Sequence, residues 1–180
     1  MSEICDAFGI PKHLHKNGRD VDPNFLKEEC LYRRFSNKMP PANWYKDEGN
    51  KKNISASLFP LNSDSYNRSK YCKAEDVLYN DSSENHYLLA GIFTIRVSKI
   101  EQVKDINTEN EPKRKFTLMV EHTPKECNYS HSEVFCYENG NKLPYGGQPT
   151  KSIRMVIRDY LLSAIDAIHK YPTITEDTIK

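Results

Sequence analysis

The sequence predicts an α+β domain, in which an antiparallel sheet arranged as a meander carries one long C-terminal amphipathic helix packed on it. Stretches rich in β-branched and aromatic residues predict three consecutive strands over 87–100, 115–122 and 131–137. Apolar residues at helical spacing then predict a helix over 151–171. Strands followed by a closing helix are typical of α+β folds.

The length and composition fit one folded domain. The chain has 180 residues, of which 37% are hydrophobic and 11% aromatic, and its mean hydropathy is −0.76. Because aromatic side chains bury large areas, we expect a folded core with long polar loops. We place the domain at 25–171, after an N-terminal arm or loop (1–24) and before a C-terminal tail (172–180).

The first predicted element, 25–35, begins as a helical turn and ends as a short strand. Successive side chains of a strand point to opposite faces. The strand therefore presents two faces, one with Leu31, Arg33 and Phe35 and the other with Tyr32 and Arg34.

The next segments alternate between loop and short elements. The stretch 36–53 contains Pro40-Pro41 and a charged run, so we expect a loop there. A short strand follows over 54–59, and 73–80 has the pattern of one or two helical turns. Gly91 marks a bulge or bend within the strand at 87–100.

The last two strands flank a turn rich in reactive groups. A charged hairpin loop over 105–115 leads into the strand at 115–122. Alternation in the strand at 131–137 then gives one face with His131, Glu133, Phe135 and Tyr137.

The C-terminal helix has clear boundaries. Thr150 can cap its N-terminus, and Pro172 ends it. Its apolar stripe consists of Ile153, Ile157, Tyr160, Leu161, Ala164, Ile165 and Ile168.

Charge and cysteine content limit the class of protein. With 26 basic and 25 acidic residues the net charge is +1, which argues against a globally basic nucleic-acid binder but allows a local basic patch. No window approaches 18 consecutive apolar residues, and the N-terminus lacks the pattern of a signal peptide, so we expect no membrane association. Five cysteines without a regular framework fit a reducing cytoplasm.

One group of residues has the chemistry of zinc ligands: His122, Cys127, His131 and Cys136. Their spacing matches none of the common zinc patterns, and no Cys-x2-Cys pair is present. Strand alternation also directs Cys136 away from His131. We therefore expect no metal and no cofactor, with a structural zinc module left as an alternative.

His131 and Glu133 form the best candidate pair for acid–base chemistry. Two residues apart on a strand, they project from the same face, where a carboxylate can orient an imidazole or raise its pKa. His122, at the end of the neighbouring strand, can join them if the register permits. The alternative is a solvated strand face with one ion pair.

Basic residues at two places predict binding of an anion. An arginine on a core strand is costly to bury unpaired, so Arg33 or Arg34 should reach a carboxylate or an anionic ligand. Lys151, Arg154 and Arg158 share a stripe at the start of the last helix, where a phosphate would be stabilised. The alternatives are an internal salt bridge for the arginine pair and an ordinary solvated face for the helix.

The segments LYRRF, SASLF, SDSYNRSKYCKAEDVLYN and SHSEVF together resemble a loose group of small bacterial proteins. Members of that group share a Tyr-Arg-Arg strand, a Ser/Phe strand and a late His-x-Glu element. They have no assigned activity, and some are encoded beside mobile-element or phage-defence genes. The resemblance implies a bacterial, cytoplasmic accessory role.

A second resemblance is to ADP-ribosyltransferase-like folds. Their strand Arg, later Ser and last-strand Glu would correspond here to Arg33, Ser57 and Glu133. The chain departs from that pattern, because Glu133 lacks the Gln/Glu-x-Glu context and no Ser-Thr-Ser follows the arginine.

Taken together, these patterns predict a non-catalytic binding or accessory protein of a bacterial multi-component system. Its partner would be a protein, with nucleic acid as the alternative through a local basic patch. The competing hypothesis is a small nuclease-like or ADP-ribosyltransferase-like enzyme that uses His131 and Glu133 with Arg33.

Overall fold

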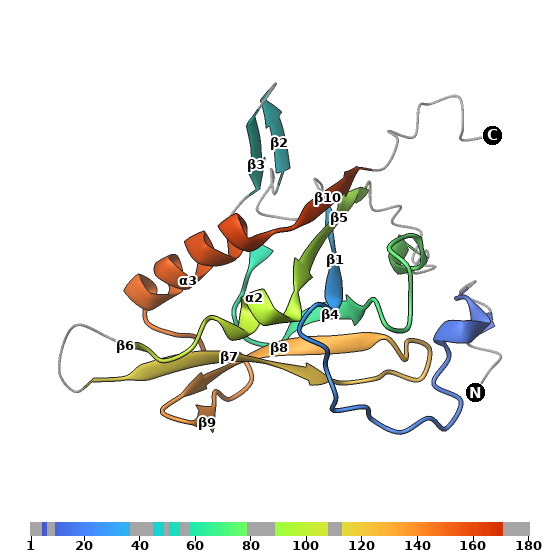
Figure 1. Ribbon diagram of the computed structural model, residues 1–180, viewed down its shortest axis with the longest axis horizontal. Helices are drawn as coiled ribbons and strands as arrows, with labels where there is room; N and C mark the ends of the chain where they lie inside the picture. The colour runs from blue at the N-terminus through green and yellow to red at the C-terminus, as the bar shows by residue number, and fades with distance from the viewer. Residues whose placement is uncertain are drawn as a thin grey trace.

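The structure of the chain is a computed structural model (Figure 1). It describes residues 5–6, 10–36, 45–48, 51–54, 58–78, 89–107 and 113–170. Within those ranges, none of the helices is both long enough and apolar enough to span a lipid bilayer.

One antiparallel sheet dominates the fold. Its strands follow the spatial order β10-β5-β1-β4-β8-β7-β6, and β9 pairs with β8 outside this path. The bounds are β1 Cys30–Ser36, β4 Asp64–Arg68, β5 Leu89–Arg96, β6 Ile106–Asn107, β7 Lys115–His122, β8 His131–Glu138, β9 Asn141–Lys142 and β10 Ala167–Lys170. A separate hairpin joins β2 (Tyr45–Glu48) to β3 (Lys51–Ile54).

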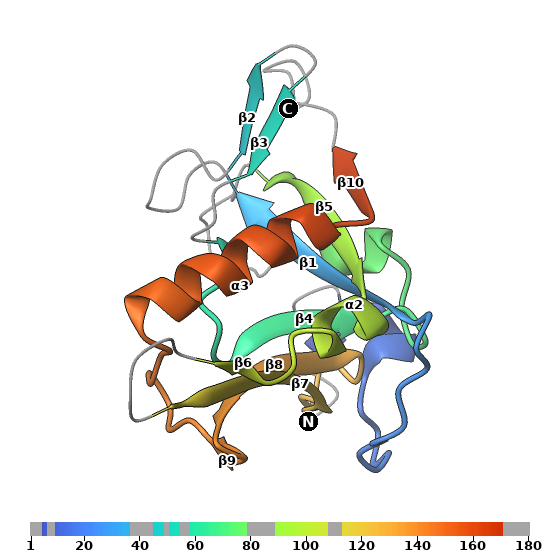
Figure 2. The same ribbon diagram turned by 60° about the vertical axis from the view of Figure 1, so that its left-hand side comes forward.

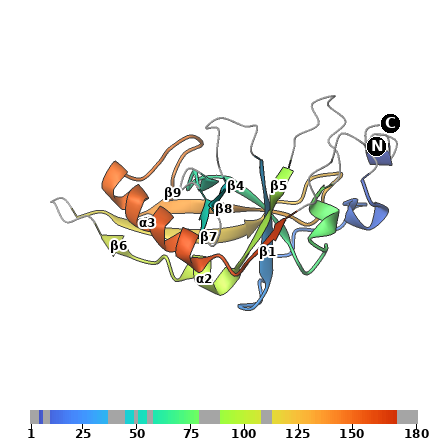
Figure 3. The same ribbon diagram turned by 90° about the horizontal axis from the view of Figure 1, so that it is seen from above.

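The sheet is strongly curled. Seen from above, β1 and β5 cross over β7 and β8 rather than run beside them (Figure 3). Because twist accumulates from strand to strand, the two ends of a sheet with this many strands point in different directions. The two-stranded hairpin projects away from the sheet (Figure 2).

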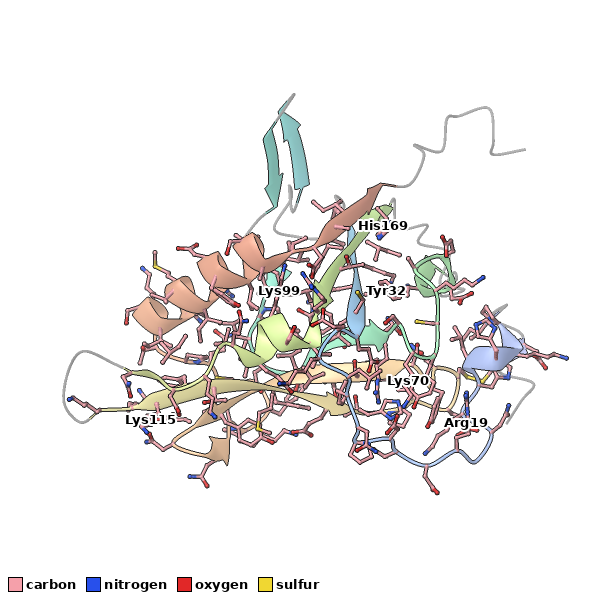
Figure 4. The ribbon with its side chains drawn as sticks, in the orientation of Figure 1. Arg19, Tyr32, Lys70, Lys99, Lys115 and His169 are labelled. Atoms are coloured by element: carbon pink, nitrogen blue, oxygen red, sulfur yellow. A yellow bond between two sulfur atoms is a disulfide. The ribbon has the colours of Figure 1, made fainter. Side chains whose placement is uncertain are left out.

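The main core lies on the face of the sheet that two helices cover, α2 (Val97–Glu101) and α3 (Lys151–Ala164). From α3 the buried residues are Ile153, Ile157, Leu161 and Ala164. They belong to one cluster with Leu31 and Phe35 of β1 and with residues of β4, β5, β7 and β8. Lys99 links the two helices, since its ammonium group donates to the carbonyl of Ala164 at the end of α3 (Figure 4).

A smaller core lies on the opposite face of the sheet. There the N-terminal segment, with the 3₁₀ helix η1 (Lys12–Leu14), packs near the 3₁₀ helix η3 (Glu75–Leu78). The cluster contains Ile10, Leu14, Cys72, Ala74, Val77 and Ile92. The described residues before residue 25 are therefore packed into the molecule.

The α+β class and the antiparallel sheet are confirmed, but the predicted meander is wrong. The strand predicted at 87–100 is β5, and its neighbours are β1 and β10 rather than β7. β4 occupies the centre of the sheet, between β1 and β8, and was not predicted. Its sequence DSYNR has one aromatic and no β-branched residue, so its composition carries no strand signal.

The C-terminal helix is shorter than predicted. It ends at Ala164, and Ala167–Lys170 form the edge strand β10, which pairs with Thr94 to Gly91 of β5. Asp166 fixes the change of direction, because its carboxylate accepts hydrogen bonds from Arg96 and from Lys99. Thr150 occupies the N-cap position, although its side chain makes no capping hydrogen bond.

The short elements predicted between the main strands agree with the structure only in part. The helical turn predicted at 73–80 is confirmed as η3. The loop predicted at 36–53 is wrong in its described part, because Tyr45–Glu48 pairs with Lys51–Ile54 as the β2–β3 hairpin. The strand predicted at 87–100 ends at Arg96 and continues as α2. The strand predicted at 54–59 is not present in its described part, since β3 ends at Ile54, and Leu58 and Phe59 are buried in the core outside any strand.

Candidate functional site

A polar pocket of about 340 Å³ opens on the sheet face opposite α3, where β1, β4 and β8 lie side by side. It lies next to the smaller core, which contributes Val77 and Cys127 to its wall. The described residues that line it are Arg33, Arg34, Ser65, Asn67, Val77, Lys125, Cys127, Asn128 and His131. Three of these described residues are basic and none is acidic. We call this site the basic pocket.

Alternation along β4 produces the polar floor of the basic pocket. Asp64, Tyr66 and Arg68 are buried, while Ser65 is exposed and Asn67 is half-buried. Since Ser65 and Asn67 both line the pocket, they share the face opposite the main core.

A network of side-chain amides and hydroxyls stabilises the wall of the pocket that is formed by the turn between β7 and β8. The Asn67 side-chain oxygen accepts from the Asn128 amide at 2.7 Å and from the Ser130 hydroxyl at 3.1 Å. Ser130 also donates to Asn128 at 2.7 Å. A β-bridge between Lys125 and Asn128 closes the turn, which places Lys125 at the pocket.

The two arginines of β1 differ in burial. The Arg33 side chain is only 13% exposed; its guanidinium lies 3.9 Å from the carboxylate of Asp64 and donates to the backbone carbonyl of Ser65 at 3.4 Å. Arg34 is exposed. The more buried arginine is therefore Arg33, which has the carboxylate neighbour expected of it, and both arginines line the basic pocket.

His131 lies at the start of β8 and uses both ring nitrogens. Nδ1 lies 2.8 Å from the carbonyl oxygen of Thr123, and Nε2 lies 3.3 Å from the hydroxyl oxygen of Ser65. A carbonyl can only accept, so Nδ1 carries the hydrogen, and in the neutral ring the lone pair of Nε2 faces Ser65. Burial lowers the pKa of His131, which keeps the ring neutral near pH 7.

Glu133 shares the face of His131, as predicted, but it is not the partner of the imidazole. The ring nitrogens of His131 point to Thr123 and Ser65 instead. Glu133 lies across the strands from Ser65 and Glu121 and is half-buried. Its carboxylate acts on His131 only through charge, opposing the effect of burial on the pKa of the ring.

The four proposed zinc ligands lie in different environments. His122 accepts a hydrogen bond from the backbone N–H of Asp22 at Nδ1, and its Nε2 donates to the carbonyl of Tyr129 at 2.6 Å. Cys136 belongs to the main core, where burial raises the pKa of its thiol to about 12. Cys127 is bonded to Cys5, and among the described residues no group of three His, Cys, Asp or Glu could hold a metal ion.

The Cys5–Cys127 disulfide joins residues 122 positions apart in the chain. Disulfides persist in oxidising surroundings, whereas the sequence predicts reduced thiols in a cytoplasm. The cytoplasmic location therefore stays a prediction. Cys127 also lines the basic pocket, so the disulfide attaches the N-terminal segment to the wall of the site.

The basic residues of α3 do not join this pocket. Arg154 donates to the side chain of Gln148, and the Arg158 guanidinium donates to the backbone carbonyl of Phe59 at 2.7 Å. Burial lowers the pKa of Arg158. Lys151 is exposed at the start of α3, on the side of the sheet away from the basic pocket.

Sequence reasoning found Arg33, Arg34 and His131 but missed the residues that connect them. Ser65 and Asn67 belong to a segment singled out only for its resemblance, and no pattern marked these two residues or Lys125 as part of a site. Only the pairing of β4 with β8 reveals that Ser65 and His131 are neighbours.

Comparison with known proteins gives no match to a family model, to a curated protein or to a solved structure. Of the three positions in the ADP-ribosyltransferase-like pattern, Ser57 lies outside the described residues. Arg33 and Glu133 lie on β1 and β8, with β4 between them.

Proposed function

We propose that this protein binds the phosphate groups of a single-stranded nucleic acid in the basic pocket. The observation that carries the proposal is the described part of the lining, in which Arg33, Arg34 and Lys125 accompany polar side chains and no described lining residue is acidic. A chain of net charge +1 that places Arg34 and Lys125 at one concave site, with Arg33 beside Asp64, has the local basic patch that this charge balance leaves open.

The chemistry of the lining favours a nucleotide unit over a bare anion. Guanidinium and ammonium groups bind phosphate, and a guanidinium can do so through two parallel hydrogen bonds. The Asn67 oxygen is held by Asn128 and Ser130, but its amide nitrogen can donate to a base edge, which single strands expose. A volume of about 340 Å³ lies within the range of small-ligand pockets.

An accessory role in a bacterial multi-component system, such as phage defence, belongs to the same proposal. It rests on the resemblance of the Tyr-Arg-Arg and His-x-Glu segments to small bacterial proteins. In such a system nucleic acid would be the ligand of the basic pocket.

The test is a titration of a fluorescently labelled single-stranded oligonucleotide, followed by anisotropy, at several salt concentrations. If two or three phosphates are contacted, the logarithm of the affinity should fall with a slope of about −1.4 to −2 against the logarithm of the salt concentration. Arg34→Ala with Lys125→Ala should weaken binding at least tenfold and flatten that slope.

Lys151→Ala is the control for the loss of an exposed positive charge, because Lys151 lies on the other side of the sheet. It should leave the affinity within about twofold. Equal weakening by the control and by the pocket variants would locate binding elsewhere. No measurable binding at low salt would contradict the proposal and favour a protein partner.

A further inference from the structure

The hydroxyl group of Ser65, in the basic pocket, has surroundings that differ from those of the nearby serines. Ser65 is exposed and lines the pocket, and its oxygen lies 3.3 Å from Nε2 of His131. By contrast, Ser130 and Ser132 are buried, and the Ser69 hydroxyl accepts the backbone N–H of Cys30.

The pairing of β4 with β8 creates this contact. Asn67 lies opposite His131 and Ser65 lies opposite Glu133, so Ser65 and His131 are diagonal neighbours on one face of the antiparallel pair. Diagonal side chains lie within reach when one of them is long or aromatic. The backbone N–H of Thr123 donates to the His131 carbonyl at 3.1 Å, which secures the start of β8.

Thr123 also orients the imidazole. Its carbonyl oxygen accepts from Nδ1 at 2.8 Å, and its hydroxyl lies 3.0 Å from the same nitrogen. With the hydrogen on Nδ1, Nε2 is the basic nitrogen and the Ser65 hydroxyl donates to it. A nucleophile, a base in hydrogen-bond reach and a third group that orients the base together define an activated nucleophile.

We propose that Ser65 is a nucleophile, that His131 is its general base, and that the pair cleaves phosphodiesters bound in the basic pocket. This proposal rests on the binding function proposed above, because the phosphate group brings the substrate to Ser65. It assigns chemistry to the site and does not require a metal or a redox cofactor.

The reaction balances in two steps. Ser65 Oγ attacks phosphorus while Nε2 of His131 takes its proton, the bond from phosphorus to the leaving oxygen breaks, and the departing alkoxide takes the proton from His131. Water then attacks the phosphoseryl diester with His131 again as base, and Ser65 Oγ leaves and regains a proton. The products are an alcohol and a phosphomonoester.

The basic residues of the pocket fit the charge that develops in these steps. Arg34 and Lys125 line the same cavity as Ser65, where fixed positive charge stabilises negative charge on the phosphoryl oxygens. Arg33 is a positioning residue, because its guanidinium donates to the Ser65 carbonyl at 3.4 Å and so supports the backbone of the nucleophile.

The experiment uses the full chain with bis(4-nitrophenyl) phosphate at pH 7.5. Attack by Ser65 would release 4-nitrophenolate, read by absorbance, and would leave a 4-nitrophenyl phosphoryl group on Ser65, read by peptide mass spectrometry. Ser65→Ala should remove release above the buffer rate. His131→Gln should slow it by about 10²- to 10⁴-fold, since that is the usual contribution of a general base.

Glu133→Gln is the matched control on the same strand face. Because the Glu133 carboxylate is not bonded to His131, release should stay within about threefold of the wild type. Circular dichroism melting of each variant checks the fold, and Ser65→Ala is the safer variant because Ser65 is exposed.

The outcomes separate this proposal from the proposed binding function. If the wild type binds the oligonucleotide but releases no 4-nitrophenolate, or if Ser65→Ala releases it at the wild-type rate, the nucleophile assignment is wrong and the binding function stands. If release depends on Ser65 and His131 but no oligonucleotide binds, the nucleophile is supported and the ligand is a different phosphodiester.

Discussion

Two buried charged side chains, Arg68 and Asp64, occupy the same strand but have very different surroundings. Arg68 is completely buried, and its guanidinium binds the Glu29 carboxylate at 2.7 and 3.0 Å and the carbonyl of Asp22 at 2.7 Å. It also stacks over the ring of Phe25 at 3.8 Å. This guanidinium is therefore paired with a carboxylate and hydrogen-bonded to backbone carbonyls, as a buried charge requires.

Asp64 is equally buried, but its carboxylate oxygens accept no hydrogen bond of normal geometry from the described residues. Burial raises its pKa to about 6, although Arg33 and the backbone N–H groups of Leu61 and Asn62 oppose that rise. Arg158, reaching in from α3, opposes it further. The folded protein therefore holds this proton more tightly than the unfolded chain.

The first prediction concerns the pH dependence of stability. For a carboxyl whose pKa is raised in the folded state, the contribution to stability falls as pH rises from about 4 through 6. Asp64→Asn cannot lose this proton. The free energy of unfolding of the variant, relative to that of the wild type, should therefore rise by about 2–3 kcal/mol between pH 4 and pH 7.

Urea unfolding of both proteins at a series of pH values would measure this difference. Asp159→Asn is the control, because Asp159 is exposed on α3 and should follow the wild-type curve. A constant difference between Asp64→Asn and the wild type across this pH range would show that Asp64 keeps an ordinary pKa.

At the scale of the elements, the edge strand β10 depends on a close approach to β5. Gly91 lies opposite Lys170 in this pairing, and a Cβ atom placed on it would lie 2.4 Å from the carbonyl oxygen of His169. It would also lie 3.2 Å from the ring of Phe35. Since the nearest atom is backbone, no side-chain rotation could relieve the contact.

The second prediction is that Gly91→Ala separates β10 from β5. The cost should be about 1–3 kcal/mol, as for overpacking in a well-packed site. Hydrogen exchange should show faster exchange of the amides of Ala167–Lys170. Gly140→Asn serves as the control, because the space around Gly140 is open and Asn tolerates its φ of +80°.

Protection of the β10 amides equal to that of the wild type would mean that the strands adjust around the added methyl group. In that case the stability of Gly91→Ala should match that of Gly140→Asn. The two measurements together therefore distinguish a rigid edge from an adaptable one.

At the scale of the whole molecule, the Cys5–Cys127 disulfide connects the N-terminal segment to the turn between β7 and β8. Further contacts join the same parts. The Tyr129 amide donates to the Leu14 carbonyl at 2.6 Å, and the Lys16 amide donates to the Glu126 carbonyl at 2.7 Å. The segment therefore packs along the wall that contains Lys125 of the basic pocket.

The third prediction is that the disulfide stabilises the whole fold. A crosslink between residues 122 positions apart restricts the unfolded chain strongly. Replacing both cysteines by serine should lower the free energy of unfolding by about 2–5 kcal/mol. Reductant should lower the stability of the wild type to a similar extent and leave the double variant unchanged.

Cys136→Ser would not be a suitable control, because Cys136 is part of the main core. Cys30→Ser is better, since Cys30 is a half-buried free thiol outside the disulfide. Its stability should remain sensitive to reductant. If reductant has no effect on the wild type, the disulfide is absent in solution.

Local sequence signals were enough to locate several elements of the fold. β-branched and aromatic composition located β5, β7 and β8, and helical spacing located the start of α3 at Lys151. Alternation placed Leu31 and Phe35 on one face of their strand and His131 with Glu133 on one face of theirs, as the structure has them. These features follow from side-chain direction and propensity within a few residues, so no tertiary information is needed.

Which of these elements are neighbours became clear from the three-dimensional fold. It placed β4 between β1 and β8, ended α3 at Ala164, and paired Cys5 with Cys127. It also brought Ser65 to His131 across 66 positions of sequence. Such contacts depend on how strands of weak local signal pair within a curled sheet, and the free energy that selects one pairing comes from the packing of the whole core.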